Sequence, residues 1–172
     1  ARRLASLRAF FRFQLDERER DDDPTSRLDG PRVQRTPPDV LSRDDVARLI
    51  QAANGLTPTD FRDRCLLELL YGAGLRASEL CELPLSSLPR GKETALIVRG
   101  KGDKERIAPL GKAARQALSD YLIIREKLLP ETAGRQAQSF VFPSRWKAGH
   151  LTRRRLAQIL ENLAVKAGLS PS

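Results

Sequence analysis

The sequence has few of the residues that build disulfide frameworks or metal sites. Its 172 residues include two cysteines, Cys65 and Cys81, and one histidine, His150. Two cysteines in apolar, helix-like surroundings and without metal-ligand spacing exclude a disulfide framework and a zinc site. His150 lies in an expected loop, and we interpret it as a loop residue and not as a catalytic group. A reducing cytoplasm is therefore the expected compartment.

Several classes of motif are also absent. The chain contains no Walker-type phosphate loop, no HExxH metal motif and no GxSxG elbow. No apolar run approaches the roughly 18 residues that a membrane span requires, and the first residues contain no signal-peptide core. We therefore expect no metal and no membrane contact. The sequence also lacks methionine, which predicts a fragment or the ordered part of a longer chain.

The sequence has an excess of positive charge. It contains 31 lysines and arginines against 22 aspartates and glutamates, a formal net charge of +9. Such a surplus creates a positive field that attracts polyanions, and nucleic acid is the commonest partner of this kind. The alternative is an ordinary basic protein without such a partner. Aromatic residues make up only 5% of the chain, so the core must consist mostly of aliphatic side chains.

The distribution of apolar residues and prolines predicts parts of two domains. Residues 1–23 carry leucines and phenylalanines at helical spacing, typical of a terminal helix that packs on an earlier part of its domain. An acidic run followed by proline, at residues 21–24, is expected to stop this helix. The prolines of residues 24–40 predict an extended interdomain linker. Residues 41–172 then belong to a second domain.

This second domain is predicted to be mainly α with a small antiparallel β-sheet, an α+β fold. Two strands are expected at residues 94–99 and 105–110, joined as a β-hairpin. A long helix is expected over residues 112–129. Other helices are expected to begin at capping residues, which are Ser42 with Asp45, Thr59 or Asp60, and Thr152.

The first candidate functional residue is Arg76, in the run GAGLRASEL of residues 72–80. This run predicts a glycine bend followed by a short helix over residues 76–83. A helix start favours anions, and an arginine there adds a planar fork that binds two phosphate oxygens. Glu79 is placed to orient a basic group. The alternative is a surface arginine whose local salt-bridge partner is Glu79, and spacing alone does not exclude it.

The second candidate is Lys101, which lies between two glycines at the expected hairpin tip. Flanking glycines let a backbone approach its partner closely, and a lysine held there can donate a proton or neutralise a phosphate. The neighbouring candidate DNA-binding residues are Arg99, Lys104 and Arg106. The alternative is a solvated polar turn, since glycine and lysine are common in turns.

A third basic region covers residues 145–155, where an aromatic residue lies among basic residues at an expected helix start. This composition is typical of a surface that grips a nucleic-acid backbone. The alternative is a solvated helix face. The candidate DNA-binding residues of this region are Lys147, Arg153 and Arg154.

The chain has two tyrosines, Tyr71 and Tyr121. Both fall on apolar faces of expected helices. We therefore interpret both as core residues and not as nucleophiles.

The motifs around Arg76 and Lys101 together resemble the tyrosine recombinase family, and the closest likeness is to its bacterial Xer-type members. The matching runs are AGLRASEL (residues 73–80) and VRGKGDKERIAPLG (residues 98–111). The run RLASLRAFF (residues 3–11) resembles the last helix of the family's N-terminal core-binding domain. The resemblance covers essentially the whole chain. It implies that residues 41–172 are the N-terminal portion of the catalytic domain.

The resemblance implies a reaction in which a tyrosine attacks a DNA phosphodiester and forms a 3′-phosphotyrosyl link, without metal or other cofactor. Arg76 would hold the scissile phosphate, Lys101 would protonate the leaving oxygen, and Glu79 would support the site. The implied partner is double-stranded DNA, on which the full-length protein would form a tetramer with itself or with a paired recombinase. The implied role is chromosome dimer resolution or integration.

The sequence departs from the family in one respect. The family's His-x-x-Arg motif and its nucleophilic tyrosine have no match in these 172 residues. This departure implies that the chain as given is catalytically incomplete, so the activity is assigned to the parent protein. The alternative hypothesis is a non-enzymatic DNA-binding module or a degenerate relative of the recombinases.

Overall fold

The computed structural model describes residues 2–29, 40–90, 93–100, 105–129, 135–145 and 147–169. It divides the chain into two compact units, Ala1–Asp39 and Val40–Ser172. None of the helices in the described ranges combines the length and apolarity that crossing a bilayer requires. The two units are described separately below.

The first unit consists of one helix and a segment that folds back along it. Helix α1 (Arg2–Asp16) ends earlier than the acidic run predicted, because Arg18 adopts a left-handed φ of 57° and turns the chain. The Arg8 guanidinium donates to the Leu28 carbonyl, which fixes the returning segment. Within that segment the N–H and hydroxyl of Thr25 both donate to Asp23, at 2.8 and 2.6 Å.

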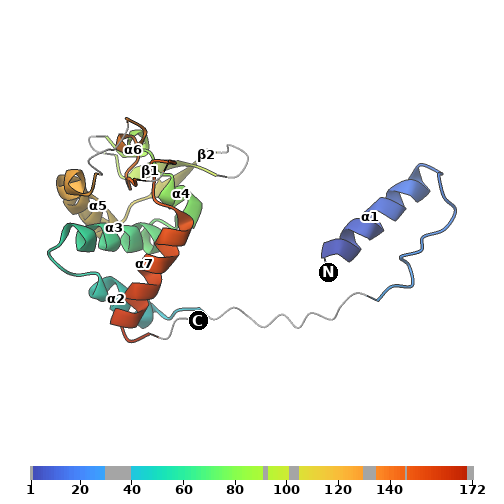
Figure 1. Cartoon of the computed structure of the whole chain (residues 1–172), viewed down its shortest axis with the longest axis horizontal. Helices are drawn as coiled ribbons and strands as arrows, with labels where there is room; N and C mark the ends of the chain where they lie inside the picture. The colour runs from blue at the N-terminus through green and yellow to red at the C-terminus, as the bar shows by residue number, and fades with distance from the viewer. Residues whose placement is uncertain are drawn as a thin grey trace. The chain divides into compact units, whose positions relative to one another are not determined.

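The second unit contains the predicted helices and the predicted hairpin, which confirms a mainly α fold with a small antiparallel sheet (Figure 1). The 3₁₀ turns η1 and η2 and the short helix α6 were not predicted. In chain order the elements are α2 (Arg43–Ala52), α3 (Pro58–Gly72), α4 (Ala77–Cys81), η1 (Leu85–Ser87), β1 (Ala95–Arg99), β2 (Glu105–Pro109), α5 (Lys112–Ile124), η2 (Arg125–Leu128), α6 (Arg135–Gln138) and α7 (Arg153–Lys166).

The capping residues decide where the helices of this unit begin. Ser42 and Asp45 form the predicted capping box of α2, and the Thr152 hydroxyl caps α7. The predicted start of α3 at Thr59 or Asp60 was wrong. Thr57 is the N-cap, with Pro58 in the first turn, where a proline's missing N–H costs nothing and its fixed φ suits the helix.

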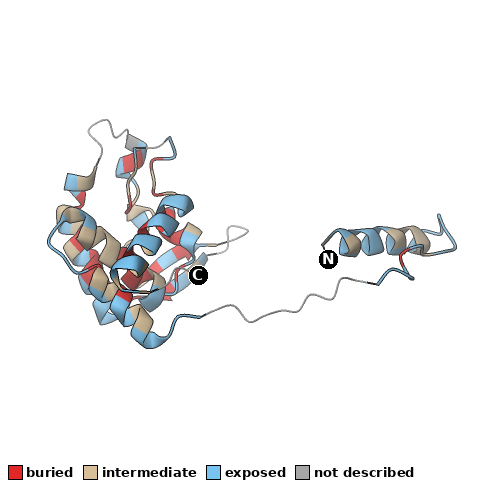
Figure 2. Ribbon diagram, turned by 60° about the horizontal axis from the view of Figure 1, so that its bottom comes forward, coloured by how far each residue is buried: buried red, intermediate tan, exposed pale blue. Residues whose placement is uncertain are grey.

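The core of the second unit lies where α3 packs against α5, α2 and α4. Figure 2 shows the buried residues towards the inside of this unit and the exposed residues on its outer side. Tyr121 is fully buried and stacks on Phe142 with ring centroids 5.2 Å apart, which confirms it as a core residue. The same prediction for Tyr71 was wrong. Tyr71 is 57% exposed, because it lies about 200° around α3 from the buried Leu69.

The predicted long helix over residues 112–129 ends as an α-helix at Ile124 and continues as the 3₁₀ turn η2. The first residue of that turn, Arg125, is 7% exposed. Its guanidinium donates to carbonyl oxygens of Phe140, Val141 and Gln138 at 2.5–3.2 Å. Sequence reasoning missed this buried arginine, although its place directly after three apolar residues was a usable signal.

The segment that Arg125 holds is itself paired with the chain after α4. Val141 N–H donates to the Leu83 carbonyl and Leu85 N–H donates to the Ser139 carbonyl, both at 2.8 Å. Arg125 therefore links the end of α5 to the end of α4. This link helps to fix the position of α4 in the fold.

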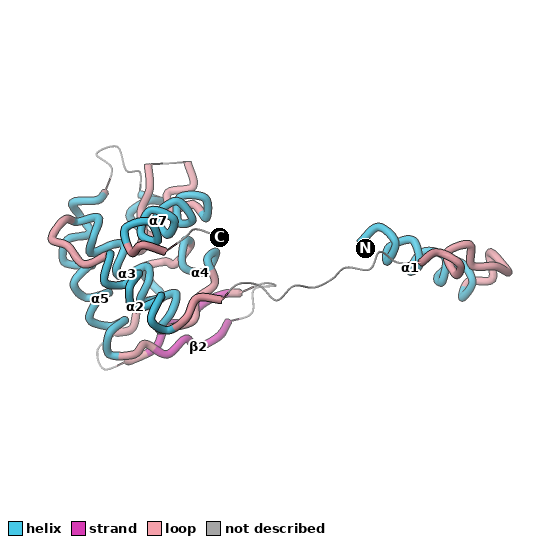
Figure 3. The backbone as a smooth tube through the Cα atoms, turned by 90° about the horizontal axis from the view of Figure 1, so that it is seen from below, coloured by secondary structure: helices cyan, strands magenta, loops and turns pink. Residues whose placement is uncertain are grey.

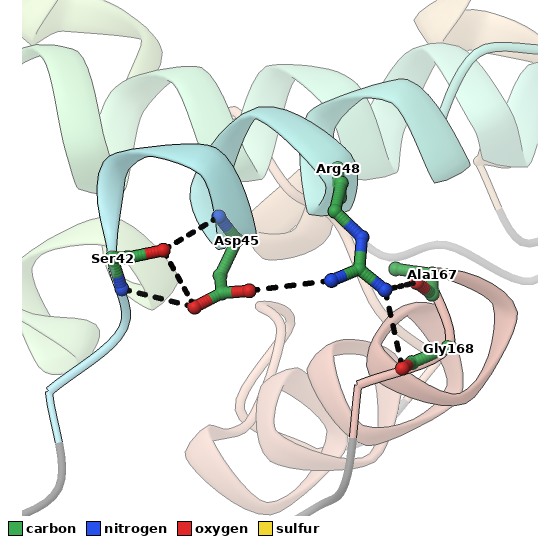
Figure 4. Close-up of polar contacts among 5 residues, drawn as sticks. All are labelled: Ser42, Asp45, Arg48, Ala167 and Gly168. Carbon is green, nitrogen blue, oxygen red and sulfur yellow. Dashed lines mark hydrogen bonds and ion pairs between the residues drawn. The ribbon is translucent and has the colours of Figure 1, made fainter.

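A second arginine, Arg48, joins α2 to the end of α7 (Figure 4). Its Nη2 donates to the carbonyls of Ala167 and Gly168 at 2.6 and 3.2 Å. Its Nη1 lies 3.4 Å from the Asp45 carboxylate, which also caps α2. Gly168 adopts a positive φ of 66° and ends α7 as predicted. The carbonyls at the end of α7 are thereby satisfied by α2.

Candidate active site

The turn between α3 and α4 places Arg76 at the edge of the unit. Gly74 has a φ of 58°, and the next N–H, of Leu75, donates back to the Leu69 carbonyl at 3.4 Å. Arg76 is then the N-cap of α4, with its side chain 69% exposed. The helix spans only Ala77–Cys81, shorter than predicted. A helix this short adds little dipole, so attraction of an anion depends on the Arg76 guanidinium itself.

The Glu79 carboxylate is the centre of the site. Its side chain is 3% exposed and accepts from Arg76 Nη1 at 2.7 Å and from Arg76 N–H at 2.8 Å. It also accepts from Nη2 of Arg106, on β2, at 2.7 Å. Glu79 is thus the predicted local partner of Arg76, and it additionally connects α4 to the hairpin, which spacing along the chain did not predict.

Hydrogen bonds keep the Glu79 carboxylate ionised. Burial by itself raises the pKa of Glu79, but the bonds from Arg106 and Arg76 outweigh burial and hold the pKa at about 2. At neutral pH the group is therefore a fixed negative charge between two guanidinium groups. It can orient a cation, but it cannot donate a proton.

The stability of the second unit should therefore depend on pH through Glu79. The folded-state pKa lies below the ordinary value of 4.5, so the stabilisation is complete above pH 4.5 and is lost as pH falls towards 2. We expect the loss from this group to be about 2–3 kcal/mol. The measurement is the free energy of unfolding of the chain and of Glu79→Gln, by urea titration between pH 6 and 2.

The difference between the two proteins isolates Glu79 from the other carboxyl groups, several of which also have lowered pKa values. The wild-type advantage over Glu79→Gln should stay constant from pH 6 to about 4.5 and should shrink as pH falls from there towards 2. A difference that stays constant with pH would show that the Glu79 carboxylate has no such coupling to folding.

A cleft of about 950 Å³ opens beside Arg76. Residues of α4, η1 and β1 line it, and Figure 3 shows the hairpin at one edge of the helical unit, beside α4. The cationic side chains that line the cleft are Arg76, Arg90 and Arg99. Arg99 is 69% exposed and lies 3.0 Å from Glu105 across the hairpin. The cleft therefore brings together two of the predicted functional arginines.

The remaining predicted residues lie in different places. Lys101 and Lys104 lie outside the described residues. Arg106 is directed inward, towards Glu79 and the Gly74 carbonyl. Lys147, Arg153 and Arg154 are exposed, the last two in the first turn of α7.

Helix α7 packs against α4, which brings one of these cations close to the site. Burial raises the pKa of the Cys81 thiol, at the end of α4, to about 11, and the nearby charge of Arg153 partly opposes that rise. Both cysteines are buried thiols in helices, as predicted. Cys81 is therefore an inert core residue, whereas Arg153 is an exposed cation near α4.

In the part of the chain that the structure describes, the Arg76 guanidinium hydrogen-bonds to Glu79 and to neither tyrosine. The Tyr121 hydroxyl is buried and donates to the Val141 carbonyl at 2.9 Å, and burial raises the pKa of this phenol. Tyr71 is exposed on α3. Among the described residues, no group of three or more histidine, cysteine or acidic side chains is arranged to hold a metal ion.

Comparisons with known proteins show the family to which the chain belongs. Residues 39–172 match the model of the phage integrase family. Tyrosine recombinase XerD of Caulobacter vibrioides is 46% identical over 170 residues, which cover 98% of this chain and 55% of that protein. The chain thus spans about half the length of this relative.

Solved structures show the same fold. The crystal structure of XerA recombinase matches with a TM-score of 0.63 and 27% identity, over 79% of this chain and 46% of that one. The structure of XerH recombinase bound to its difH substrate matches with a TM-score of 0.60 and 22% identity, over 77% and 37% of the two chains. The family match and the sequence identity lead to one conclusion: the chain belongs to the phage integrase family, the tyrosine recombinases.

Proposed function

We propose that the protein containing this chain is a site-specific recombinase that cuts and rejoins double-stranded DNA, in chromosome dimer resolution or integration. The observation that carries the proposal is the array of Arg76, Glu79 and Arg106 beside an open cleft. The 46% identity to a XerD recombinase supports it. The matching XerH site-specific recombinase structure, which is bound to its difH substrate, and a matching lambda integrase structure, which is bound to DNA, support a DNA ligand for this fold.

In the proposed reaction a tyrosine hydroxyl gives its proton to a general base in the remainder of the parent protein, and its oxygen attacks the scissile phosphorus. The new bond joins the tyrosine oxygen to phosphorus, and the bond from phosphorus to the 5′-oxygen breaks. Arg76 offsets the negative charge that the phosphate oxygens gain in the transition state. Lys101 gives its proton to the departing 5′-oxygen, which leaves as a hydroxyl. Attack of a partner strand's 5′-hydroxyl on the 3′-phosphotyrosyl link reverses these steps and rejoins the DNA.

The nucleophile is proposed to come from outside these 172 residues. Tyr121 is excluded because its hydroxyl is buried and bonded to a backbone carbonyl. Tyr71 is exposed but lies on α3, outside the cleft lining. We likewise propose that the family's His-x-x-Arg motif is supplied by the remainder of the parent protein, and that the protein works as a tetramer on paired DNA sites.

The proposed phosphate contacts are cations of the hairpin, of the segment before α7 and of α7 itself. Phosphate contacts fix the register of a protein on a duplex without reading its sequence. Arg99 on the hairpin lines the same cleft as Arg76, and Arg153 on α7 lies near Cys81 at the end of α4. The full set of proposed contacts is Arg99, Lys104, Lys147, Arg153 and Arg154.

The proposal is tested with the full-length protein and a nicked suicide substrate, from which the cleaved strand end diffuses away. We expect a covalent protein–DNA adduct that survives denaturation, with the DNA attached through its 3′-phosphate. Tight DNA binding without any adduct would instead favour the non-enzymatic DNA-binding module. A full-length protein that does not bind DNA at all would contradict both the recombinase and the DNA-binding module.

DNA binding should weaken steeply with salt, because each neutralised phosphate releases condensed counterions. The logarithm of the binding constant should fall by about 0.9 per contact for each tenfold rise in salt. Arg153→Gln with Arg154→Gln should therefore reduce the salt slope by about 2, measured by fluorescence anisotropy from 50 to 300 mM KCl. Arg115→Gln, an exposed arginine of α5, is the matched control. An unchanged slope in the double variant would remove these two residues from the DNA interface.

A further inference from the structure

Arg106 of β2 contacts two residues that lie far from it along the chain. Its Nη2 donates to Glu79 Oε2 at 2.7 Å and to the Gly74 carbonyl at 3.0 Å. Glu79 lies 27 positions and Gly74 lies 32 positions away along the chain. One nitrogen of Arg106 thus connects β2 both to the turn that precedes Arg76 and to the acid that holds Arg76.

The two oxygens of Glu79 have separate partners. Oε1 accepts from the Arg76 guanidinium, whereas Oε2 accepts from the Arg76 N–H and from Arg106. Rotating the carboxylate away from the Arg76 guanidinium would break the Oε2 bonds as well. Because charge-assisted bonds in a buried site are strong, Arg106 restricts the orientation of Glu79.

The Arg76 side chain depends on that restriction. It is 69% exposed, and Glu79 is its one hydrogen-bond acceptor within the described ranges of the chain. A long, exposed side chain has many rotamers, and the bond from one Arg76 nitrogen to Glu79 restricts them. The Arg76 guanidinium therefore keeps its orientation only while the Glu79 carboxylate keeps its own orientation. If Glu79 turns, Arg76 loses the direction in which it presents its remaining donors to the cleft.

We propose that Arg106 is a positioning residue, which acts through Glu79 and Gly74 to orient Arg76 towards the scissile phosphate. This proposal rests on the proposed recombinase function. It assigns to Arg106 a role different from the phosphate contact that its sequence position suggested. The Arg106 side chain is 36% exposed, and its Nη2 already serves two protein oxygens.

The test compares cleavage with binding in the full-length protein. Single-turnover cleavage of the suicide substrate at saturating protein and the DNA dissociation constant are measured for wild type, Arg106→Gln, Arg106→Lys and the control Arg115→Gln. We expect Arg106→Gln to slow cleavage about 10- to 100-fold, as a small misplacement of a catalytic group does. Its dissociation constant should stay within about threefold of wild type, since no phosphate contact is lost.

Arg106→Lys should recover part of the cleavage rate. A lysine restores a cation beside Glu79, although its compact ammonium cannot reproduce the planar geometry of a guanidinium. Arg115→Gln should match wild type in both measurements. Weaker binding by Arg106→Gln with an unchanged saturating rate would overturn the proposal and show a direct phosphate contact.

A substrate with a neutral methylphosphonate at the scissile position distinguishes a misoriented Arg76 from a wider disturbance of the structure. The methylphosphonate lacks the negative charge that Arg76 neutralises. If Arg106→Gln slows cleavage by misorienting Arg76, its cleavage rate on this substrate should be within about threefold of the wild-type rate. An equal defect on both linkages would overturn the proposal in favour of a structural disturbance.

A second measurement does not depend on cleavage. In the 172-residue chain, carbon-13 NMR of the Glu79 carboxyl should show its pKa rising in Arg106→Gln and staying unchanged in Arg115→Gln. An unchanged titration of Glu79 in Arg106→Gln would overturn the link between the two residues. A wild-type protein that binds DNA but forms no adduct would instead contradict the proposed function, whatever this titration shows.

Discussion

Replacing Arg76 by alanine is expected to abolish formation of the covalent protein–DNA adduct while leaving most of the DNA affinity. The Arg76 guanidinium is bonded to Glu79, is largely exposed and lines the cleft. Removing one preorganised donor from a transition-state oxyanion costs a factor of about 10²–10³ in rate. Binding should weaken only about two- to tenfold, because one phosphate contact among many is lost.

The measurement is adduct yield against time on the suicide substrate, with the dissociation constant determined in parallel. Arg76→Lys should be almost as defective as the alanine variant, since an ammonium cannot bind two phosphate oxygens in a planar fork. Arg90→Ala changes another arginine of the same cleft and is the matched control. An Arg76→Ala protein that still forms adduct at the wild-type rate would exclude a catalytic role for this residue.

Replacing Arg125 by alanine should produce the largest loss of stability in the second unit. The guanidinium is buried, and its bonds satisfy the carbonyls of Gln138, Phe140 and Val141. Its removal leaves polar backbone groups without their donor and opens a cavity. We expect the free energy of unfolding to fall by about 3–5 kcal/mol and the melting temperature to fall by about 10–15 °C.

The effect should also reach the candidate active site. The segment that Arg125 holds pairs with Leu83 and Leu85, directly after α4.

Urea and thermal unfolding followed by circular dichroism measure the change in stability. Lys127→Ala, which changes an exposed cation of the same 3₁₀ turn, should cost under about 0.5 kcal/mol. Equal stability of Arg125→Ala and Lys127→Ala would show that the carbonyl contacts contribute nothing.

Local signals predicted the elements of the second unit well, because capping and hairpin formation depend on neighbouring residues. Ser42 with Asp45 and Thr152 begin helices as predicted, and residues 95–99 pair with residues 105–109. The errors in the predicted helix ends were shifts of a few residues. Thr57 and not Thr59 caps α3, and Arg18 ends α1 before the acidic run.

Predictions of burial were less successful, because a helix face is known only after its neighbours are placed. Tyr121 lies in the core as expected, but Tyr71 is on the exposed side of α3. Arg125 was not recognised as a buried residue, since its acceptors come from a segment 12–16 positions further along the chain.

By itself, the sequence determined the mainly helical fold, the hairpin, and the place of Arg76 after a glycine turn with Glu79 one helical turn on. These features follow from backbone preferences and from contacts between residues a few positions apart. Only the tertiary structure decided that Glu79 is buried and that Arg106 completes its hydrogen bonds. The physical reason is that Arg106 reaches Glu79 across 27 positions of the chain, and such a contact depends on how the hairpin packs beside α4 and not on any local spacing.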